Sequence, residues 1–193
     1  MLFKYLRFMI VICLIPYLSG CAAVAVGGAA AAGTATAVDS RTTGTQIEDQ
    51  TIEVKAYRAF NADAELKEQA HLNVTSYNTV VLLTGETPTD AMRQTAVELV
   101  KNVEKVTHVY NEITIAAPSS LVSRSSDSYI TTKVKTKMFA DKELSGLKIK
   151  VVTEKGVVYL MGLTTRAEAE RATDIARQTG GVQKVVKLFQ YTD

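Results

Sequence analysis

The sequence predicts an α+β protein made of two copies of one small domain, each with a three-stranded mixed sheet and two helices on one face. Three observations indicate this fold class. The segment VVLLTGET at 80–87 returns as VVYLMGLT at 157–164, 77 residues later. Matching apolar positions continue on both sides at nearly the same offset. Within each copy, apolar spacings of four, typical of helices, alternate with spacings of two, typical of strands. A long period present twice indicates two like domains, not a solenoid of about three or more units.

The chain begins with a segment that is typical of an export signal. Residues 1–20 carry Lys4 and Arg7, then an apolar run that is too short to span a bilayer comfortably, and they end at LSGC, 18–21. This ending resembles the lipobox of bacterial lipoproteins. The resemblance implies that Cys21 receives a diacylglyceryl group on its sulfur and, after cleavage, an acyl chain on its amine. Three such chains would make release from a membrane negligible.

The residues after the lipobox predict a tether and a location. Residues 21–45 are rich in Ala, Gly and Thr, bury little, and are expected to form a flexible tether. Ala22 and Ala23 stand where inner-membrane lipoproteins resembling those of enteric bacteria carry Asp, so the signal favours the outer membrane. Cys13 would leave with the signal, so the folded part has no thiol for a disulfide or a metal cluster.

The first copy, 46–116, reads as helix, strand, strand, helix and strand. A turn is expected at 76–79, Gly85 is expected to end the second strand, and Thr87-Pro88-Thr89 supplies a start signal for the second helix. The last strand is expected over 106–115. The apolar positions that predict these elements are Ile52, Ala56 and Phe60; Leu72 and Val74; Val81 and Leu83; and Met92, Ala96, Leu99, Val100 and Val103.

The second copy, 127–193, follows a short, Ser-rich linker at 117–126. Its turn is TEKG at 153–156, where Gly156 can take a positive φ. Thr164-Thr165 signals the start of its second helix, and the last strand is expected over 182–191. Since each copy has only about 70 residues, its core is small, and we expect the two domains to pack together or against a membrane.

The repeated pattern resembles the BON domain of bacterial envelope proteins. The segments at 81–85 and 158–162 carry its V-x-L-x-G core, and Gly181-Val182 resembles its turn into the last strand. The first copy departs, with Lys105 before Val106. Two such domains behind a lipobox resemble dual-BON outer-membrane lipoproteins over nearly the whole chain. This resemblance implies a non-enzymatic protein that binds anionic phospholipid, supports envelope integrity and gathers at the division site.

Charge is divided unequally between the two copies. Residues 46–116 hold 6 Lys or Arg against 11 Asp or Glu, whereas residues 127–193 hold 12 against 8. In the second copy, YITTKVKTKMF at 129–139 would place an aromatic ring beside lysines on one helix face. Such a face suits a membrane interface, where Tyr lies at the headgroups and ammonium groups meet phosphates. The predicted phospholipid-binding residues are Tyr129, Thr132, Lys133, Thr136, Lys137 and Phe139.

Other interpretations of these residues stay open. The lysine-rich face could be an ordinary solvated helix surface, and Phe139 could be an exposed wedge or a core residue. The chain could instead be a periplasmic adaptor that uses its acidic first domain to hold a protein, with 109–115 as an edge strand for pairing. It could also be a structural spacer in the envelope. The sequence leaves the oligomeric state, the protein partners and the preferred lipid headgroup open.

The sequence predicts no enzyme, no metal site and no cofactor. His71 and His108 have no nucleophile or metal-ligand spacing around them. Asp63 and Asp141 recur after the first helix of each copy, where Asp caps or turns the backbone. Nucleic acid is not expected as a partner, because an exported protein does not meet chromosomal DNA.

Overall fold

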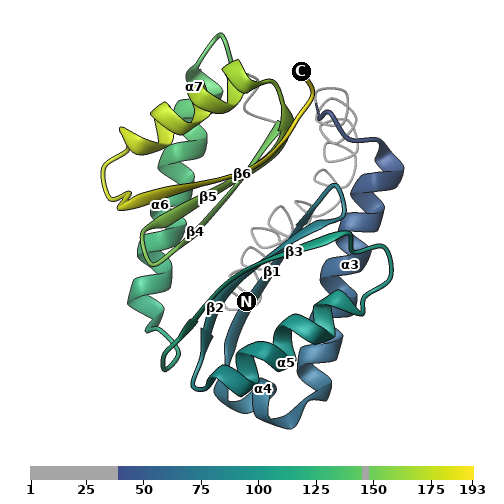
Figure 1. Cartoon of the computed structure of the whole chain (residues 1–193). Helices are drawn as coiled ribbons and strands as arrows, with labels where there is room; N and C mark the ends of the chain where they lie inside the picture. The colour runs from purple at the N-terminus through teal and green to yellow at the C-terminus, as the bar shows by residue number, and fades with distance from the viewer. Residues whose placement is uncertain (1–38, 145–147) are drawn as a thin grey trace, which may run out of the picture. The chain divides into compact units, whose positions relative to one another are not determined.

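The structure, a computed structural model, describes residues 39–144 and 148–193. The expected export signal, Cys21 and most of the expected tether lie outside the described residues. Within them the order helix, strand, strand, helix, strand occurs twice, which confirms the predicted α+β class (Figure 1).

Among the described residues, each copy forms one sheet with helices beside it. The first contains α3 (Thr43–Ala62), α4 (Ala64–Gln69), β1 (His71–Tyr77), β2 (Val80–Thr87), α5 (Asp90–Lys101) and β3 (His108–Ile115). The second contains α6 (Leu121–Ala140), β4 (Ile149–Glu154), β5 (Val157–Thr164), α7 (Arg166–Arg177) and β6 (Lys184–Tyr191).

Both sheets are mixed, as predicted. The first has the order β1-β2-β3, and the second has the order β4-β5-β6. In each sheet the first two strands form an antiparallel hairpin, and the last strand lies parallel to the central one after the helical crossover. The first and last strands of each sheet are therefore edge strands.

Polar side chains start the helices at or near the positions that the sequence indicated. Thr89 accepts a hydrogen bond from an amide of the first turn of α5, and Thr165 does the same for α7. Glu168 completes a capping box with Thr165. The short helix α4 was not predicted. It forms because Asp63 ends α3 and also accepts a hydrogen bond from the Leu66 amide at 2.9 Å.

Two helices begin earlier than the sequence suggested. Helix α3 begins at Thr43, inside the expected tether, and α6 begins at Leu121, so the last six residues of the expected linker are helical. The reason is local, because Thr42 and Ser120 cap the first turns with their hydroxyl groups. Once its amides are satisfied, a helix can extend beyond the region that packs on a core.

The hairpin turns are tighter than predicted. Strand β1 extends to Tyr77, so the first turn consists of Asn78 and Thr79, both with positive φ (51° and 64°). In the second domain, Lys155 and Gly156 take the same conformation, with φ of 49° and 75°. Two-residue hairpins favour such turns because their twist matches that of the strands.

The glycines of the central strands lie within the strands and do not end them. Strand β2 continues for two residues past Gly85, and β5 does so past Gly162. Gly85 has a φ of 113°, and a Cβ placed on it would lie 2.0 Å from the His71 carbonyl oxygen. A close approach of β1 to β2 therefore requires glycine at this position.

The turn into the last strand also differs between the copies. Gly181 has a φ of 102°, and Lys105 takes the equivalent place with a φ of 71°. The last strands begin at His108 and Lys184, each two residues later than predicted. A lysine in this conformation carries backbone strain that a glycine would not.

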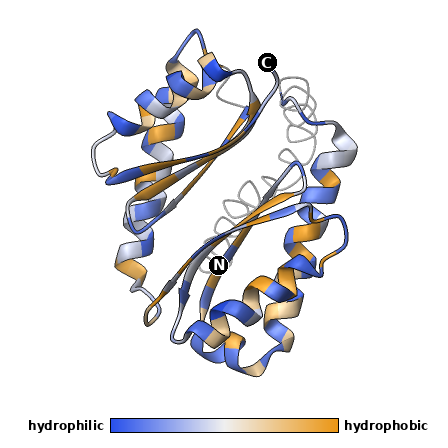
Figure 2. Ribbon diagram, in the orientation of Figure 1, coloured by the Kyte–Doolittle hydropathy of each residue, from blue (hydrophilic) through white to orange (hydrophobic). Residues whose placement is uncertain are grey.

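Each domain has a core between its helices and one face of its sheet. Figure 2 shows hydrophobic residues, in orange, on the strands and at intervals along the helices. The opposite faces of the two sheets meet in a third apolar cluster, which contains Tyr77, Leu82, Tyr159, Met161 and Leu188. Both faces of the central strands are thus buried. This explains the unbroken apolar character of VVLL and VVYLM, which is typical of strands covered on two sides.

Polar contacts between the domains pair the acidic copy with the basic one. The Lys155 ammonium group lies 2.9 Å from the carboxylate of Glu86, a side chain that is completely buried. The Tyr159 hydroxyl donates a hydrogen bond to Glu112 at 3.3 Å. Burial raises the pKa of Glu86, but the contacts with Lys155 and Ser119 and the charge of Lys155 together outweigh burial and hold the pKa below its ordinary value.

We expect Glu168 to give this fold an acid-sensitive contribution to stability. Hydrogen bonds from Thr164 and from the Thr165 amide lower the pKa of Glu168 to about 2. Its stabilisation is therefore complete above the unfolded pKa of 4.5 and is lost as the pH falls from 4.5 through 2. We predict that Glu168→Gln lowers the free energy of unfolding by about 2 kcal/mol at pH 7.

Urea unfolding of the wild type and the variant at several pH values measures this difference. The difference in the free energy of unfolding between the wild type and Glu168→Gln should narrow steadily below pH 4.5. The control Glu143→Gln, at a side chain that is 78% exposed, should change the free energy of unfolding little at any pH. A gap that stays constant with pH would contradict the assignment.

Candidate functional site

Helix α6 presents its exposed face at the surface of the second domain. Ile130, Val134 and Met138 are buried in the core, whereas Tyr129 is 65% exposed and Phe139 is 54% exposed. Phe139 is therefore a surface residue and not a core residue. We refer to Tyr129, Thr132, Lys133, Thr136, Lys137 and Phe139 as the α6 patch; the structure brings them together along this one helix.

The two lysines of the α6 patch are oriented by backbone carbonyl groups. The Lys133 ammonium group donates to the Gly180 carbonyl at 2.8 Å, and that of Lys137 donates to the Gln178 carbonyl at 3.1 Å. Both carbonyls follow the last turn of α7, where the helix dipole favours cations. Lys133 also lies 5.3 Å from the centre of the Tyr129 ring. Within the described part of the chain, neither lysine forms an ion pair, so both charges remain available to an anion.

Sequence reasoning missed two apolar residues on the same helix. Leu121 and Val122, in the first turn of α6, are 77% and 78% exposed. Val122, Tyr129 and Thr136 are seven residues apart, so they lie on one stripe of the helix. The sequence signal is the continuation of this stripe into SSLVS, 119–123, where the Ser-rich composition favours a linker.

A cavity of about 460 Å³ adjoins the α6 patch. Tyr129 lies at one side of it, and Lys155 and Gln183 contribute polar groups. Gly180 and Gly181 line it with backbone only, so no side chain from this loop fills the space. The cavity therefore offers room for a small polar group next to the exposed ring and the lysines.

The matching face of the first domain has different side chains. At the offset of 78 residues, Tyr129 and Phe139 of the α6 patch correspond to Thr51 and Asn61 of α3, so neither aromatic ring has an aromatic counterpart. Lys133 corresponds to Lys55, which pairs with Glu104 at 3.2 Å. The combination of exposed aromatic rings with lysines that form no ion pair among the described residues thus belongs to α6.

Sequence reasoning also missed a pair of buried carboxylates. Asp49 accepts hydrogen bonds from the Asn78 and Thr79 amides, both at 2.8 Å, and Asp127 does the same for Lys155 and Gly156 at 2.8 and 2.9 Å. Their offset of 78 residues equals that of the first helices, which could have revealed them. They hold the hairpin turns and have a structural role.

The histidines and recurring aspartates do not form a reactive cluster. His71 lies on β1 and His108 on β3, the two outer strands of the same sheet. Asp141 accepts from the Glu143 amide at 3.0 Å and pairs with Arg171, as expected of a capping residue. In the described ranges, no three metal-ligating side chains come together. No helix of those ranges is long and apolar enough to cross a bilayer.

The fold and the α6 patch together define a tandem of two like α+β modules, the second of which exposes aromatic rings beside lysines on α6. The chain belongs to the BON-domain family: the family model matches residues 48–117 and 126–193. The domains of this family are non-catalytic, and the chain is not an enzyme.

Three curated proteins are similar over most of the chain. "Outer membrane lipoprotein DolP" of Haemophilus influenzae is 45% identical over 177 residues, which cover 92% of this chain and 91% of that protein. The "21 kDa hemolysin" of Actinobacillus pleuropneumoniae is 40% identical, over 80% of this chain and 79% of its own. "Osmotically-inducible protein Y" of Escherichia coli is 30% identical, over 74% and 72%. The predicted resemblance to dual-BON outer-membrane lipoproteins is confirmed.

Proposed function

We propose that this chain is an outer-membrane lipoprotein, anchored through Cys21 and facing the periplasm, whose second BON domain binds anionic phospholipid and thereby supports envelope integrity. The anchor rests on the LSGC sequence and on the printed name of the DolP relative. The binding site that we propose is the α6 patch. A role at the division site would be a further consequence of this function.

The observation that carries the proposal is the exposure of Tyr129 and Phe139 beside Lys133 and Lys137. Tyrosine favours the headgroup region of a bilayer, and each lysine near an anionic surface contributes about 1 kcal/mol. Such weak binding is sufficient for a protein already held at a membrane, since an anchor raises the local concentration of the site.

The acidic first domain does not obstruct this surface. Its carboxylates Glu86 and Glu112 face the second domain through Lys155 and Tyr159, and Glu53 lies 4.0 Å from Lys150. The lysines that meet the acidic domain are thus different from those of the α6 patch. This arrangement also leaves fewer acidic groups for an adaptor function of the first domain, although β3 is an edge strand.

The test uses residues 22–193, without lipid, mixed with vesicles. We expect binding to vesicles that contain phosphatidylglycerol and none to pure phosphatidylcholine, with affinity falling as salt shortens the Debye length. Lys133→Glu with Lys137→Glu should weaken binding roughly tenfold or more. Co-sedimentation measures the bound fraction, and circular dichroism checks the fold.

The matched control is Lys67→Glu with Lys101→Glu, which makes the same charge change at exposed positions of the first domain. It should bind nearly as well as the wild type. Equal loss in both double variants would mean that only net charge matters, and equal binding to both kinds of vesicle would exclude an electrostatic site.

A further inference from the structure

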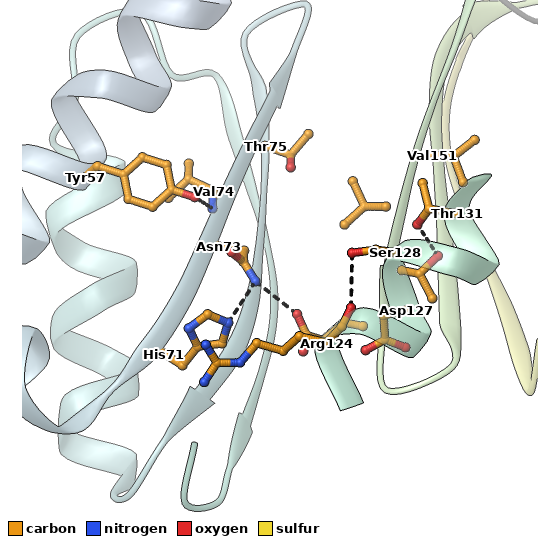
Figure 3. Close-up of a pocket in the computed structure, with 13 residues that line it drawn as sticks. Tyr57, His71, Asn73, Val74, Thr75, Arg124, Asp127, Ser128, Thr131 and Val151 are labelled. Carbon is orange, nitrogen blue, oxygen red and sulfur yellow. Dashed lines mark hydrogen bonds between the residues drawn. The ribbon is translucent and has the colours of Figure 1, made fainter. Parts of the chain in front are cut away.

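A groove runs between the outer strands of the two sheets, away from the α6 patch. The side-chain amide of Asn73 donates a hydrogen bond to the Glu154 carboxylate at 3.2 Å, and the Tyr77 hydroxyl donates one to the Lys148 carbonyl at 2.9 Å. Because the later residue of β1 contacts the earlier residue of the second domain, β1 and β4 pass each other in opposite directions. Between them lies a cavity of about 390 Å³, lined by both strands, by Tyr57 and by the N-terminal half of α6 (Figure 3).

The edge of β1 that borders this groove is closed. Tyr77 pairs with Val80 next to a two-residue turn, so alternate residues of β1 point their amides away from β2. Val74 and Ser76 are two of these residues. Their amides donate to the Tyr57 hydroxyl and to the Glu53 carboxylate, respectively, so β1 cannot offer them to another strand.

The corresponding edge of β4 lacks this closure. The register of the second hairpin directs the amides of Val151 and Thr153 away from β5. The residues that match Tyr57 and Glu53 at the offset of 78 are Lys135 and Thr131. A lysine ammonium group cannot accept a hydrogen bond, and the Thr131 hydroxyl donates to the Thr153 hydroxyl at 2.7 Å. Across residues 39–144 and 148–193, no side chain or loop accepts from either amide.

The charge beside this edge is positive. Lys135 is half-buried, and burial together with nearby Lys150 lowers its pKa. The two carboxylates that line the groove already accept hydrogen bonds. Glu154 accepts one from the Asn73 side chain, and Asp127 accepts from the backbone amides of the hairpin turn. In the described part of the chain, no carboxylate lies within ion-pair distance of Lys135. The edge of β4 therefore combines two amides that have no acceptor among the described residues with the ammonium group of Lys135, which forms no ion pair there. Lys150 is already 4.0 Å from Glu53.

We propose that β4 is a docking edge for an extended, acidic peptide segment of another protein, which adds to the second sheet as a fourth strand. Main-chain hydrogen bonds to Val151 and Thr153 would supply affinity, and a carboxylate of the segment would pair with Lys135. Because the edge lies in a groove, a narrow strand can reach it and a flat bilayer cannot. This site is separate from the α6 patch and does not depend on lipid binding.

A first test needs no ligand and uses the first repeat as its control. Hydrogen exchange of the lipid-free chain, residues 22–193, followed by NMR should show amides of Val151 and Thr153 exchanging roughly tenfold or more faster than those of Val74 and Ser76. Tyr57→Phe, which removes the acceptor, should speed exchange at Val74 and leave Val151 unchanged. Equal protection of both pairs in the wild type would overturn the open edge.

The second test uses fluorescein-labelled eight-residue peptides, one alternating Glu with Val and one alternating Lys with Val. Fluorescence anisotropy should show binding of the acidic peptide only, with NMR shifts centred on Val151 and Thr153. The double variant Thr131→Glu with Lys135→Tyr copies the closure of the first repeat onto the second, and it should weaken binding roughly tenfold or more.

The control for this variant is Thr192→Glu with Lys142→Tyr, which makes the same substitutions at exposed positions of the second domain outside the α6 patch. It should bind the acidic peptide as the wild type does. The proposal is overturned if both double variants lose binding alike, if both peptides bind equally, if the shifts fall on β3, or if the chain pairs with a second copy of itself through β4.

Discussion

Replacing Gly85 with alanine should destabilise the first domain by about 3–5 kcal/mol. The new Cβ would lie 2.0 Å from the His71 carbonyl oxygen and 3.1 Å from the Leu72 Cα, and both are backbone atoms. The φ of 113° adds strain for any residue with a side chain. Relief requires β1 to move away from β2, which would break hydrogen bonds at the end of the hairpin. Since a domain of this size has about 5–15 kcal/mol of stability, the loss is a large fraction of the total.

Chemical unfolding measured by circular dichroism tests this expectation. Gly44→Ala is the control, because a Cβ there meets only the Thr42 hydroxyl, at 3.7 Å, within a helix that favours alanine. It should leave the unfolding midpoint unchanged or raise it slightly. Gly162→Ala should be intermediate, since its Cβ would lie 2.9 Å from the Lys148 carbonyl oxygen and no positive φ is involved. If Gly85→Ala unfolds like the wild type, the close approach of the strands is wrong.

Replacing Asp49 with alanine should cost about 3–4 kcal/mol, because four donors lose one shared acceptor. The carboxylate accepts from the Ser76 hydroxyl at 2.7 Å and from the two turn amides, and the Arg41 guanidinium group pairs with it at 2.7 Å. The Asp49 side chain is only 4% exposed, so water cannot replace these contacts. The turn residues also have positive φ, which makes the turn more dependent on its acceptor.

The same unfolding measurement serves here, with Asp174→Ala as the control. Asp174 is 58% exposed, and its ion pair with Arg177 is 3.6 Å long, so its removal should change stability by no more than about 0.5 kcal/mol. NMR should additionally show lost protection at the Asn78 and Thr79 amides in the Asp49 variant. Equal stability of the two variants would mean that the turn does not need the carboxylate.

The repeat made most of the fold predictable from the sequence. Apolar positions at matching offsets fixed the order of elements, and threonines marked the starts of α5 and α7. Apolar periodicity was a poor guide to elements that extend beyond a core. The first turn of α6 depends on its Ser120 cap and exposes Leu121, so nothing in a core-facing pattern announces it.

Apolar periodicity did not predict which strand faces of the two sheets contact each other. Leu82 and Tyr159 lie on the strand faces that point away from the helices, and each is buried only because the other sheet is present. The opposite net charges of the two copies were visible in the sequence. They did not show which residues meet, because the pairing of Lys155 with Glu86 depends on how two separate sheets pack.

For the α6 patch, helical spacing predicted which side chains share a face, and the structure places Tyr129, Thr136 and Phe139 at the surface. The partners of Lys133 and Lys137 were beyond sequence reasoning, since they are carbonyl groups of the loop after α7, more than 40 residues away. The role of the patch in binding lipid stays a prediction. The edges of β1 and β4 differ in their side-chain acceptors, Tyr57 and Glu53 for β1, and the apolar pattern shared by the two hairpins does not indicate this difference.

The shared apolar cluster between the sheets limits what deletion experiments can teach. A half-molecule that ends near Ile115 would leave Tyr77 and Leu82 in water, and the other half would do the same to Tyr159 and Met161. Exposed strand faces of this kind promote aggregation. A phenotype of such a fragment would report its solubility as much as the missing activity. Single-residue changes at the surface are therefore the sounder way to assign a function to each domain.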